Sequence, residues 1–373
     1  MKNCLFIIDS LGAGGAERVV LTLARTMSKM GHQVTIISVD NLVEYEIDFP
    51  ANLHTLNFKK SRWEATYRIY GKKLKQLISR LESERGKFDL ITVHLQKAHR
   101  LTQQAGITGA FYCIHSTISQ ASLGNRTGLR LYLKRRKLKR LLDGKDIISV
   151  SKGIAADLID NVHVKPHSLR TIYNPLDFNH IKTLAGMENP FADEDYIIHV
   201  GRVTESKRHD ILLKAFAKTN IRPKLLILGD GTLLHSIQQL AEQLKISDRV
   251  IFAGFRENPY PILRGAKLCV LSSDYEGLSM ALIEALILNV PVISTDCPVG
   301  PREILRGSLT RYLVPVQDIS ALAKALDNTL NEIALNNYII DMTLLDKFDA
   351  DHACGQYMAL AEHSTTGHSI TGQ

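Results

Sequence analysis

Two glutamates eight residues apart carry the densest chemical signal in this 373-residue chain. Glu276 directly follows an apolar run typical of a buried strand, and Glu284 lies in the helical pattern that comes next. Between them, Gly277, Leu278 and Ser279 place backbone N–H groups at the expected helix start, which suits phosphate or sugar oxygens. A carboxylate at Glu284, among apolar neighbours, needs polar partners, and sugar hydroxyls would serve. A pair of ordinary helix glutamates is the alternative interpretation.

A second candidate site is a basic loop after another apolar run. Arg202 and Lys207 lie five residues apart on this loop. A planar guanidinium and a compact ammonium can converge on a diphosphate, although such loops are also often simply solvated. After the next expected strand, the triplet Gly229-Asp230-Gly231 allows another close approach to the backbone.

Glycines also follow the first expected strand, where the chain reads SLGAGGAER at 10–18. Gly14 and Gly15 let backbone N–H groups approach an anion at the start of a helix. A dinucleotide-binding fingerprint needs a third glycine near position 17, where Glu17 stands. This disfavours a dehydrogenase, although Asp40 after the second strand superficially suits a ribose. A tight turn without a ligand is the alternative.

These candidates need a framework of alternating strands and helices. Short apolar runs alternate with helical patterns along the chain, which indicates βαβ units and two parallel sheets. In such sheets, ligands bind at the carboxyl ends of the strands. The expected strands are 4–8, 34–39, 90–93, 110–114, 147–150, 197–200, 225–228, 250–252, 268–271 and 290–294, and the expected helices are 16–30, 63–81, 210–218, 233–244, 261–265 and 279–288.

The length of 373 residues exceeds what one core usually supports, so two domains are expected, with a hinge after Asp177. Residues 1–177 carry 28 Lys and Arg against 15 Asp and Glu, a net charge of +13, which leaves −5 of the total +8 for residues 178–373. A basic half beside an acidic half indicates an anionic partner for the first: nucleic acid, an acidic saccharide or an anionic membrane surface.

The strongest concentration of positive charge lies at 126–142. Eight Lys or Arg stand among the fifteen residues 126–140, interleaved with leucines and Tyr132, which predicts a basic amphipathic helix. Such a helix is typical of an anionic membrane surface or an anionic acceptor, and the alternative is a solvated face. No nucleic-acid motif or aromatic interleaving accompanies the charge, so nucleic-acid binding is disfavoured.

The remaining composition favours a cytoplasmic protein without a membrane span. The apolar runs are far shorter than a span, and the N-terminus lacks the features of a signal peptide. Five scattered cysteines without CxxC spacing are predicted to be reduced packing residues. Two D-x-D triplets, 193–195 and 349–351, do not follow a strand, so no metal site is predicted.

Taken in order, the motifs resemble those of a known enzyme family. EGLSMALIEA at 276–285 is preceded by GRVTESK at 201–207, GDG at 229–231 and FAGF at 252–255. Near the start stands GAGGAER, followed by SVSKGI at 149–154, YNPLD at 173–177 and, later, DCPVGPREI at 296–304. Together they closely resemble the retaining glycosyltransferases of family 4. The resemblance implies the GT-B fold: α/β, with two Rossmann-like doubly wound domains facing a cleft and a C-terminal helix crossing back to the N-terminal domain.

The resemblance assigns a range to each domain. Residues 1–177 would bind the acceptor, 178–345 the nucleotide sugar, and 346–363 would form the helix that packs back on the first domain. Residues 364–373 are small and polar and are expected to be a disordered tail.

The resemblance also assigns roles to individual residues. Arg202 and Lys207 would bind the donor diphosphate, Glu276 the transferred sugar with Gly277 to Ser279 nearby, and Glu284 the ribose. Gly14 and Gly15 would face the phosphates, and His115 would lie near the donor sugar. Gly254 and Phe255 would form the wall against the base.

The predicted activity is therefore the transfer of a hexose or N-acetylhexosamine from a nucleotide sugar, by default UDP-linked, to a glycan or glycolipid acceptor. The resemblance implies a retaining mechanism in which Arg202 and Lys207 stabilise the leaving diphosphate in place of a metal. Surface polysaccharide or lipopolysaccharide synthesis at the cytoplasmic face of the inner membrane, reached by the basic helix, is the expected setting. The alternatives are a nucleotide-sugar epimerase, a sucrose- or trehalose-type synthase, or an inactive glycan- or nucleotide-binding module of the same fold.

Overall fold

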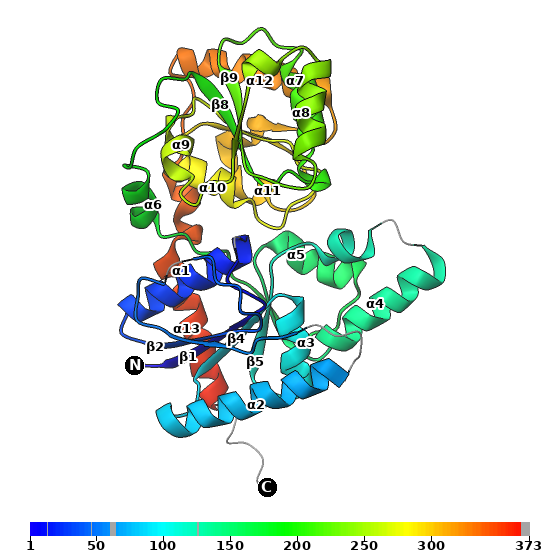
Figure 1. The fold of residues 1–373 in the computed structure, drawn as a ribbon, viewed down its shortest axis with the longest axis vertical. Coiled ribbons are helices and arrows are strands. Elements are labelled where there is room, and N and C mark those ends of the chain that lie inside the picture. Colours follow the sequence, from blue (N-terminus) through cyan, green and yellow to red (C-terminus); the bar gives the residue numbers. More distant parts are fainter. Residues whose placement is uncertain (13, 46, 60–64, 125–126, 367–373) are drawn as a thin grey trace. The chain divides into compact units, whose positions relative to one another are not determined.

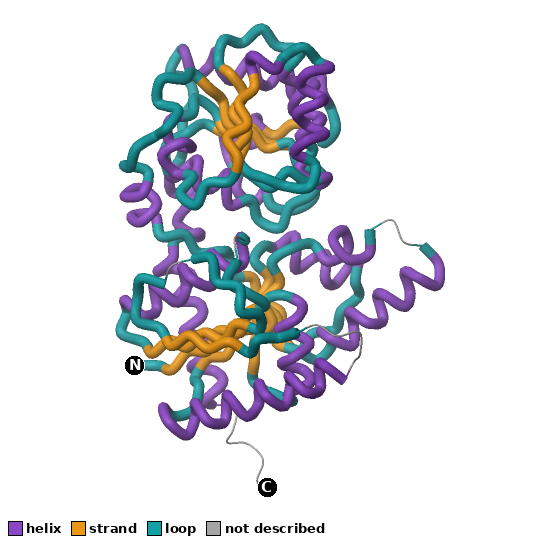
Figure 2. Tube along the Cα trace, in the orientation of Figure 1, coloured by secondary structure: helices purple, strands orange, loops and turns teal. Residues whose placement is uncertain are grey.

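The computed structural model describes residues 1–12, 14–45, 47–59, 65–124 and 127–366. The chain divides into two compact units, each built around one parallel sheet flanked by helices (Figures 1 and 2). Unit 1 comprises Met1–Asp177 and Lys347–Gln373, and unit 2 comprises Phe178–Asp346.

Unit 1 contains a seven-stranded sheet in the order β3-β2-β1-β4-β5-β6-β7. All of its strand pairs are parallel. The order reverses between β1 and β4, as in doubly wound folds. Its strands are β1 (Asn3–Ile8), β2 (Gln33–Ser38), β3 (Asn52–Thr55), β4 (Leu90–His94), β5 (Ala110–Ile114), β6 (Asp146–Ser149) and β7 (Ser168–Thr171), and its helices are α1 (Gly15–Lys29), α2 (Ala65–Arg85), α3 (Gln96–Ala105), α4 (Gly128–Leu142), α5 (Lys152–Ala156) and α13 (Ala350–Thr366).

Unit 2 contains a six-stranded parallel sheet in the order β10-β9-β8-β11-β12-β13. Here the order reverses between β8 and β11. Its strands are β8 (Tyr196–Val200), β9 (Lys224–Leu228), β10 (Val250–Gly254), β11 (Cys269–Leu271), β12 (Val292–Thr295) and β13 (Leu313–Val314), and its helices are α6 (Phe178–Leu184), α7 (His209–Phe216), α8 (Leu234–Gln243), α9 (Tyr260–Gly265), α10 (Met280–Ile287), α11 (Pro301–Ile304) and α12 (Ile319–Ala334).

The central strands are buried on both faces, which explains their continuous apolar sequences. Every residue of β1 is buried, and the same holds for β11 and β12. The five cysteines are free and buried, and burial raises the thiol pKa of each to about 12. They act as packing residues within the two cores.

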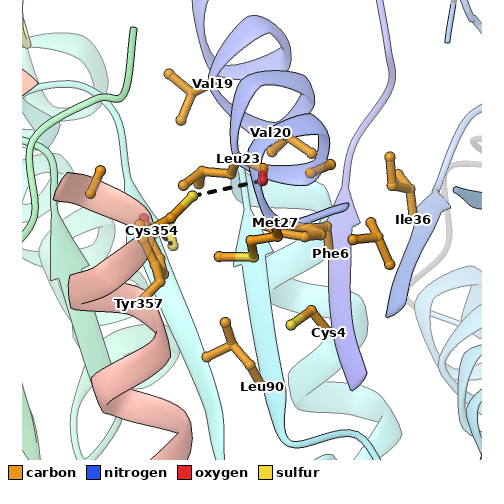
Figure 3. Close-up of a cluster of buried hydrophobic side chains, with 14 of the residues drawn as sticks. Cys4, Phe6, Val19, Val20, Leu23, Met27, Ile36, Leu90, Cys354 and Tyr357 are labelled. Atoms are coloured by element: carbon orange, nitrogen blue, oxygen red, sulfur yellow. Dashed lines mark hydrogen bonds between the residues drawn. The ribbon is translucent and has the colours of Figure 1, made fainter. Parts of the chain in front are cut away.

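The C-terminal helix α13 completes the core of unit 1. Cys354 and Tyr357 on α13 lie among side chains of α1, β1 and β4 (Figure 3). The Cys354 thiol donates to the carbonyl oxygen of Leu23 at 3.9 Å, and the Tyr357 hydroxyl lies 3.8 Å from the Cys113 thiol. The fold class is confirmed: two parallel-sheet α/β units, with the last helix packed on the first.

Some element boundaries differ from the sequence-based expectations. Helix α2 extends to Arg85 rather than 81, and its expected start at Trp63 lies outside the described residues. Helix α6 begins directly after the expected hinge at Asp177. Helix α13 reaches Thr366, so residues 364–366 of the expected tail are helical, and 367–373 lie outside the described residues.

The two D-x-D triplets have structural partners. Asp195 pairs with Lys267 at 2.7 Å, and Asp349 accepts a hydrogen bond from the Asp351 N–H at 2.9 Å, capping the start of α13. Within the described part of the chain, no helix is both long and apolar enough to cross a membrane.

Candidate functional site

A lysine and a glutamate from different loops form an ion pair at the carboxyl edge of the unit 2 sheet. Lys207 ends a short 3-10 helix after β8, and Glu276 lies in the loop after β11. Lys207 Nζ donates to Glu276 Oε1 at 2.6 Å, and the Ser273 hydroxyl donates to the same oxygen at 2.6 Å. The Glu276 side chain is only 9% exposed. The structure thus joins two candidate residues that the sequence places 69 positions apart.

Further hydrogen bonds hold the two loops together. The Ser272 hydroxyl donates to the carbonyl oxygen of Lys207 at 2.8 Å, and the Asp274 N–H donates to that of Ser206 at 2.9 Å. The hydroxyl of Thr295, at the end of β12, donates to the Ser273 carbonyl at 2.6 Å. The loops after β8, β11 and β12 therefore form one hydrogen-bonded edge.

Arg208 makes a third connection, which the sequence analysis did not assign. Its guanidinium donates to Asp210 at 2.9 and 3.0 Å and to Asp274 at 2.9 Å. These hydrogen bonds raise the pKa of Arg208 above its usual value, and the bond to Asp210 contributes most. The Arg208 backbone is left-handed, with φ of 51°. Asp210 is visible two positions away in sequence, whereas Asp274 becomes a neighbour only in the fold.

Gly229 and Gly231 allow the loop after β9 to lie close against the loop that carries Arg202. The Val203 N–H donates to the carbonyl oxygen of Asp230 at 2.9 Å, so the loops after β8 and β9 lie backbone to backbone. A Cβ atom on Gly229 would collide with the carbonyl oxygen of Gly201, and one on Gly231 with that of Val203. The close approach predicted for these glycines is therefore made by the chain itself. Arg202 is exposed on this supported loop.

Glu284 is more deeply buried than its sequence context indicates. Helix α10 begins at Met280, which places Glu284 in its second turn, 1% exposed. The Tyr260 hydroxyl donates to Glu284 Oε1 at 3.4 Å. Partial burial was expected, and the packing of α9 against α10 makes it nearly complete.

The segment between the two glutamates begins α10. Leu278 and Ser279 are buried, and Ser279 occupies the N-cap position without a side-chain capping hydrogen bond. Gly300 packs against this segment with φ of 100°, and a Cβ there would lie 3.3 Å from Glu276 Cβ and from the Gly277 carbonyl oxygen. This explains the glycine in the motif at 296–304.

Gly254 is the last residue of β10 and Phe255 follows it, at the same edge of unit 2. Gly254 has φ of 68°, and its carbonyl oxygen accepts the Gly229 N–H at 2.9 Å. Phe255 is 57% exposed. An exposed aromatic ring after a strand is compatible with stacking on a nucleobase.

In unit 1, His115 follows β5 and contacts a second histidine. His115 Nε2 lies 2.9 Å from Nδ1 of His94, the last residue of β4. Burial lowers the pKa of His115 to about 3. His94 was not singled out from the sequence, and its place at a strand end was the available signal.

The glycine loop of unit 1 leads directly into α1. Gly14 is the N-cap residue of α1, with no side-chain capping bond, and a Cβ on it would collide with the carboxylate of Glu17. Gly15 has open space around its Cα. Asp40 forms an ion pair with Lys97.

Among the described residues, no group of three or more His, Cys, Asp or Glu side chains is arranged to hold a metal ion. The expected activity without a metal ion therefore stays a prediction, which activity measurements must test.

Two family models cover most of the chain. Residues 13–180 match glycosyltransferase family 4, and residues 183–342 match the glycosyl transferases group 1. A Campylobacter jejuni relative, an N-acetylgalactosaminyltransferase acting on an undecaprenol-diphosphate-linked glycan, is 27% identical over 89% of this chain and 91% of its own length. The lipopolysaccharide 1,6-galactosyltransferase of Escherichia coli is 29% identical over 48% of this chain and 51% of its own.

Solved structures share the fold at lower identity. Sucrose-phosphate synthase from Thermosynechococcus elongatus superposes with a TM-score of 0.77 at 19% identity, over 98% of this chain and all of that one. HepE from Anabaena in complex with UDP gives a TM-score of 0.73 at 18% identity, again over 98% and 100%.

Because Gly229 supports the Arg202 loop, its substitution should lower the free energy of unfolding of unit 2. Gly229→Ala adds a Cβ that collides with the Gly201 carbonyl at a φ of 145°. We expect it to destabilise unit 2 by more than about 2 kcal/mol, because collision adds to the ~1–2 kcal/mol of backbone strain. Gly307→Ala is the matched control, since Gly307 also has positive φ but open space around it. Urea denaturation of both variants makes the comparison; equal losses would show that the loop contact contributes nothing.

Proposed function

Because the chain belongs to the glycosyltransferases that join a family 4 domain to a group 1 domain, we propose that it transfers a hexose or N-acetylhexosamine from a UDP-sugar to a glycan or glycolipid acceptor, with retention of configuration. Bacterial surface polysaccharide synthesis, lipopolysaccharide included, is the proposed setting. The named activities of the relatives from Campylobacter jejuni and Escherichia coli support the sugar classes and the acceptor class.

The observation that carries the proposal is the ion pair between Lys207 and Glu276. It brings a cation suited to a diphosphate within 2.6 Å of a carboxylate suited to sugar hydroxyls. A nucleotide sugar carries both groups, joined at the anomeric carbon. A site for the donor in unit 2 therefore needs these two side chains side by side.

In the proposed reaction, the bond between the anomeric carbon and the diphosphate oxygen breaks. The acceptor hydroxyl oxygen bonds to the anomeric carbon on the same face, and its proton passes to the leaving diphosphate. Arg202 and Lys207 stabilise the negative charge that develops on the leaving group. We propose that they do so without a metal ion.

The other candidate residues have supporting roles in this proposal. Glu284 binds the ribose hydroxyls and the backbone of Gly277 to Ser279 binds phosphate or sugar oxygens. Phe255 with Gly254 borders the base, which rests on the exposure of the ring. In unit 1, Gly14 and Gly15 are assigned to phosphate binding and His115 to the donor sugar.

Helix α4 supports a peripheral membrane site on unit 1. Its last turns are anchored by Leu138, Leu141 and Leu142, which are buried. Its first turns instead expose three apolar side chains, Leu129, Tyr132 and Leu133, on one helix face with the i, i+3, i+4 spacing.

Exposed Arg130, Arg136 and Lys137 accompany this apolar face. Apolar side chains that enter the headgroup region and cations that attract acidic lipids are what binding to an anionic bilayer requires. A cytoplasmic protein held on the inner membrane by α4 would meet a lipid-linked acceptor at the bilayer surface.

The proposed function predicts that Lys207 is needed and a metal is not. Lys207→Met should lower kcat by about 10²–10³, as when one transition-state donor is lost. The double variant Lys207→Met/Glu276→Gln should not recover activity, which separates the missing cation from an unpaired carboxylate. Lys218→Met, at an exposed lysine, is the control.

Release of UDP from a panel of UDP-sugars measures these rates. Wild-type activity should persist in excess EDTA. Full activity of Lys207→Met would remove Lys207 from the site, and loss of activity that Mg²⁺ or Mn²⁺ restores would establish a metal requirement.

Substitutions of the two glutamates should change the binding of UDP in different ways. Glu284→Gln should weaken UDP binding, because the ribose loses a charged acceptor. Glu276→Gln should preserve or tighten it, because Lys207 is freed for the diphosphate, while turnover of the intact UDP-sugar falls. Calorimetry with UDP on both variants, with exposed Glu257→Gln as control, decides the matter; equal weakening would mean that the roles are not separate.

Helix α4 predicts salt-dependent binding to acidic vesicles. Each cation near an anionic bilayer contributes about 1 kcal/mol, so replacing Arg130, Arg136 and Lys137 by Gln should release the protein from phosphatidylserine-containing vesicles. The matched control replaces three exposed lysines of α2, at 72, 73 and 75, by Gln. Vesicle sedimentation at rising salt measures the effect, and equal sedimentation of both triple variants would show that α4 is only a solvated face.

A further inference from the structure

Three polar side chains form a hydrogen-bonded series in unit 1, two of them buried and the third, His115, half-buried. The Thr92 hydroxyl oxygen lies 3.0 Å from His94 Nε2, and His94 Nδ1 lies 2.9 Å from His115 Nε2. Thr92 and His94 are fully buried within β4. The last nitrogen of the series, His115 Nδ1, is also buried and has no hydrogen-bond partner among the described residues.

Both imidazoles are neutral at physiological pH. Burial, with the neighbouring histidine as a second cause, lowers the pKa of His94 well below its usual value, and burial lowers that of His115 to about 3. Each ring therefore carries a single proton. The position of that proton on one ring determines its position on the other, because the hydrogen bond between them needs one donor and one acceptor.

The hydroxyl of Thr92 determines which atoms of the series donate and which accept its hydrogen bonds. If Thr92 donates to His94 Nε2, then His94 Nδ1–H donates to His115 Nε2, and His115 carries its proton on Nδ1. In the opposite direction, His94 donates to the Thr92 oxygen, and the hydroxyl proton is left with no acceptor among the described residues. In the first direction, the one buried group left without a partner among the described residues is His115 Nδ1–H, whereas the opposite direction leaves both the Thr92 hydroxyl proton and the unprotonated His115 Nδ1 without one. Each unpaired buried polar group costs about 1–3 kcal/mol, so the first direction is favoured.

The backbone around His94 holds the ring in place. Leu95 has φ of 73° and ψ of 163°, a conformation that is strained for a residue other than glycine. Its neighbours fix it: the Asp9 carboxylate accepts the N–H groups of Lys97 and Ala98 at 3.2 and 2.6 Å, and His99 Nε2 lies 2.9 Å from the Val93 carbonyl oxygen. Strain maintained beside a buried polar series is typical of a functional site.

We propose that Thr92 and His94 are positioning residues that fix the proton of His115 on Nδ1, so that His115 offers a hydrogen-bond donor to a hydroxyl or phosphate oxygen of the substrate. The part that concerns substrate rests on the proposed function; the proton position does not. His115 then acts as a neutral donor and not as a general base, because its free nitrogen already bears the proton.

The proton position is measured directly by ¹⁵N NMR of the full-length protein labelled at histidine, with His115→Phe to assign its signals. We expect wild-type His115 to be protonated at Nδ1. Thr92→Val keeps the shape and removes the hydroxyl, and His94→Phe removes both ring nitrogens. In each variant the Nε2–H form of His115, which free histidine favours, should become populated. Thr35→Val is the matched control, since Thr35 is a buried strand residue whose hydroxyl has no partner among the described residues.

Protonation of wild-type His115 at Nε2, or an unchanged proton position in both Thr92→Val and His94→Phe, overturns the inference. Loss of folding in His94→Phe leaves Thr92→Val to decide it.

Turnover distinguishes this inference from the proposed function. Thr92→Val should lower kcat/KM for the UDP-sugar about tenfold, the equivalent of ~1.4 kcal/mol, while the Kd of UDP stays unchanged. Thr35→Val should keep both. If the proton moves as expected but His115→Phe retains full turnover, the hydrogen-bonded series stands and the assignment of His115 to the substrate fails. If no nucleotide sugar is turned over by the wild type, the proposed function fails while the NMR result remains decisive.

Discussion

Two parallel sheets that must be buried on both faces set the conditions for the rest of this molecule. A strand such as β1 or β12, buried at every residue, leaves no polar side chain within the sheet that faces water. Helices must therefore cover each face, and the polar residues are displaced to the loops at the strand ends. In unit 1, part of this cover comes from α13, which brings Tyr357 from the far end of the sequence into the core.

The edges of the two sheets meet this condition with different chemistry. In unit 2, charged groups are paired: Lys207 with Glu276, and Arg208 with Asp210 and Asp274. In unit 1, the groups at the ends of β4 and β5 are neutral histidines joined by a hydrogen bond. A charge at the sheet edge needs a partner or a ligand to offset the loss of water, whereas a neutral imidazole needs only hydrogen bonds. The ion pairs of unit 2 suit a diphosphate, and the two histidines of unit 1 suit hydroxyl groups, although the unit 1 edge also holds an ion pair between Lys97 and Asp40.

The ion pair of Lys207 and Glu276 links the two halves of the proposed donor site. A diphosphate that binds Lys207 competes with Glu276 for the ammonium group, and the carboxylate then needs other donors. Sugar hydroxyls are such donors. Binding of the two halves of one nucleotide sugar would therefore be coupled through this contact. The hydrogen bonds from Ser272 and Ser273 hold both loops in place while the partners change.

The sequence by itself determined the fold class and the positions of the central strands, because continuous apolar runs of about five residues that alternate with helices are typical of strands buried on both faces of a parallel sheet. It did not reveal β3, β7 or β13, which lie at the sheet edges: β3 and β7 are only partly apolar, and β13 is only two residues long. Local motifs marked Arg202, Lys207, Glu276 and Glu284 as candidates. Only the tertiary structure decided that Lys207 contacts Glu276, that Gly229 supports the Arg202 loop, and that His94 contacts His115. Such contacts depend on which strands become neighbours, and strand order is a property of the whole sheet that no local pattern encodes.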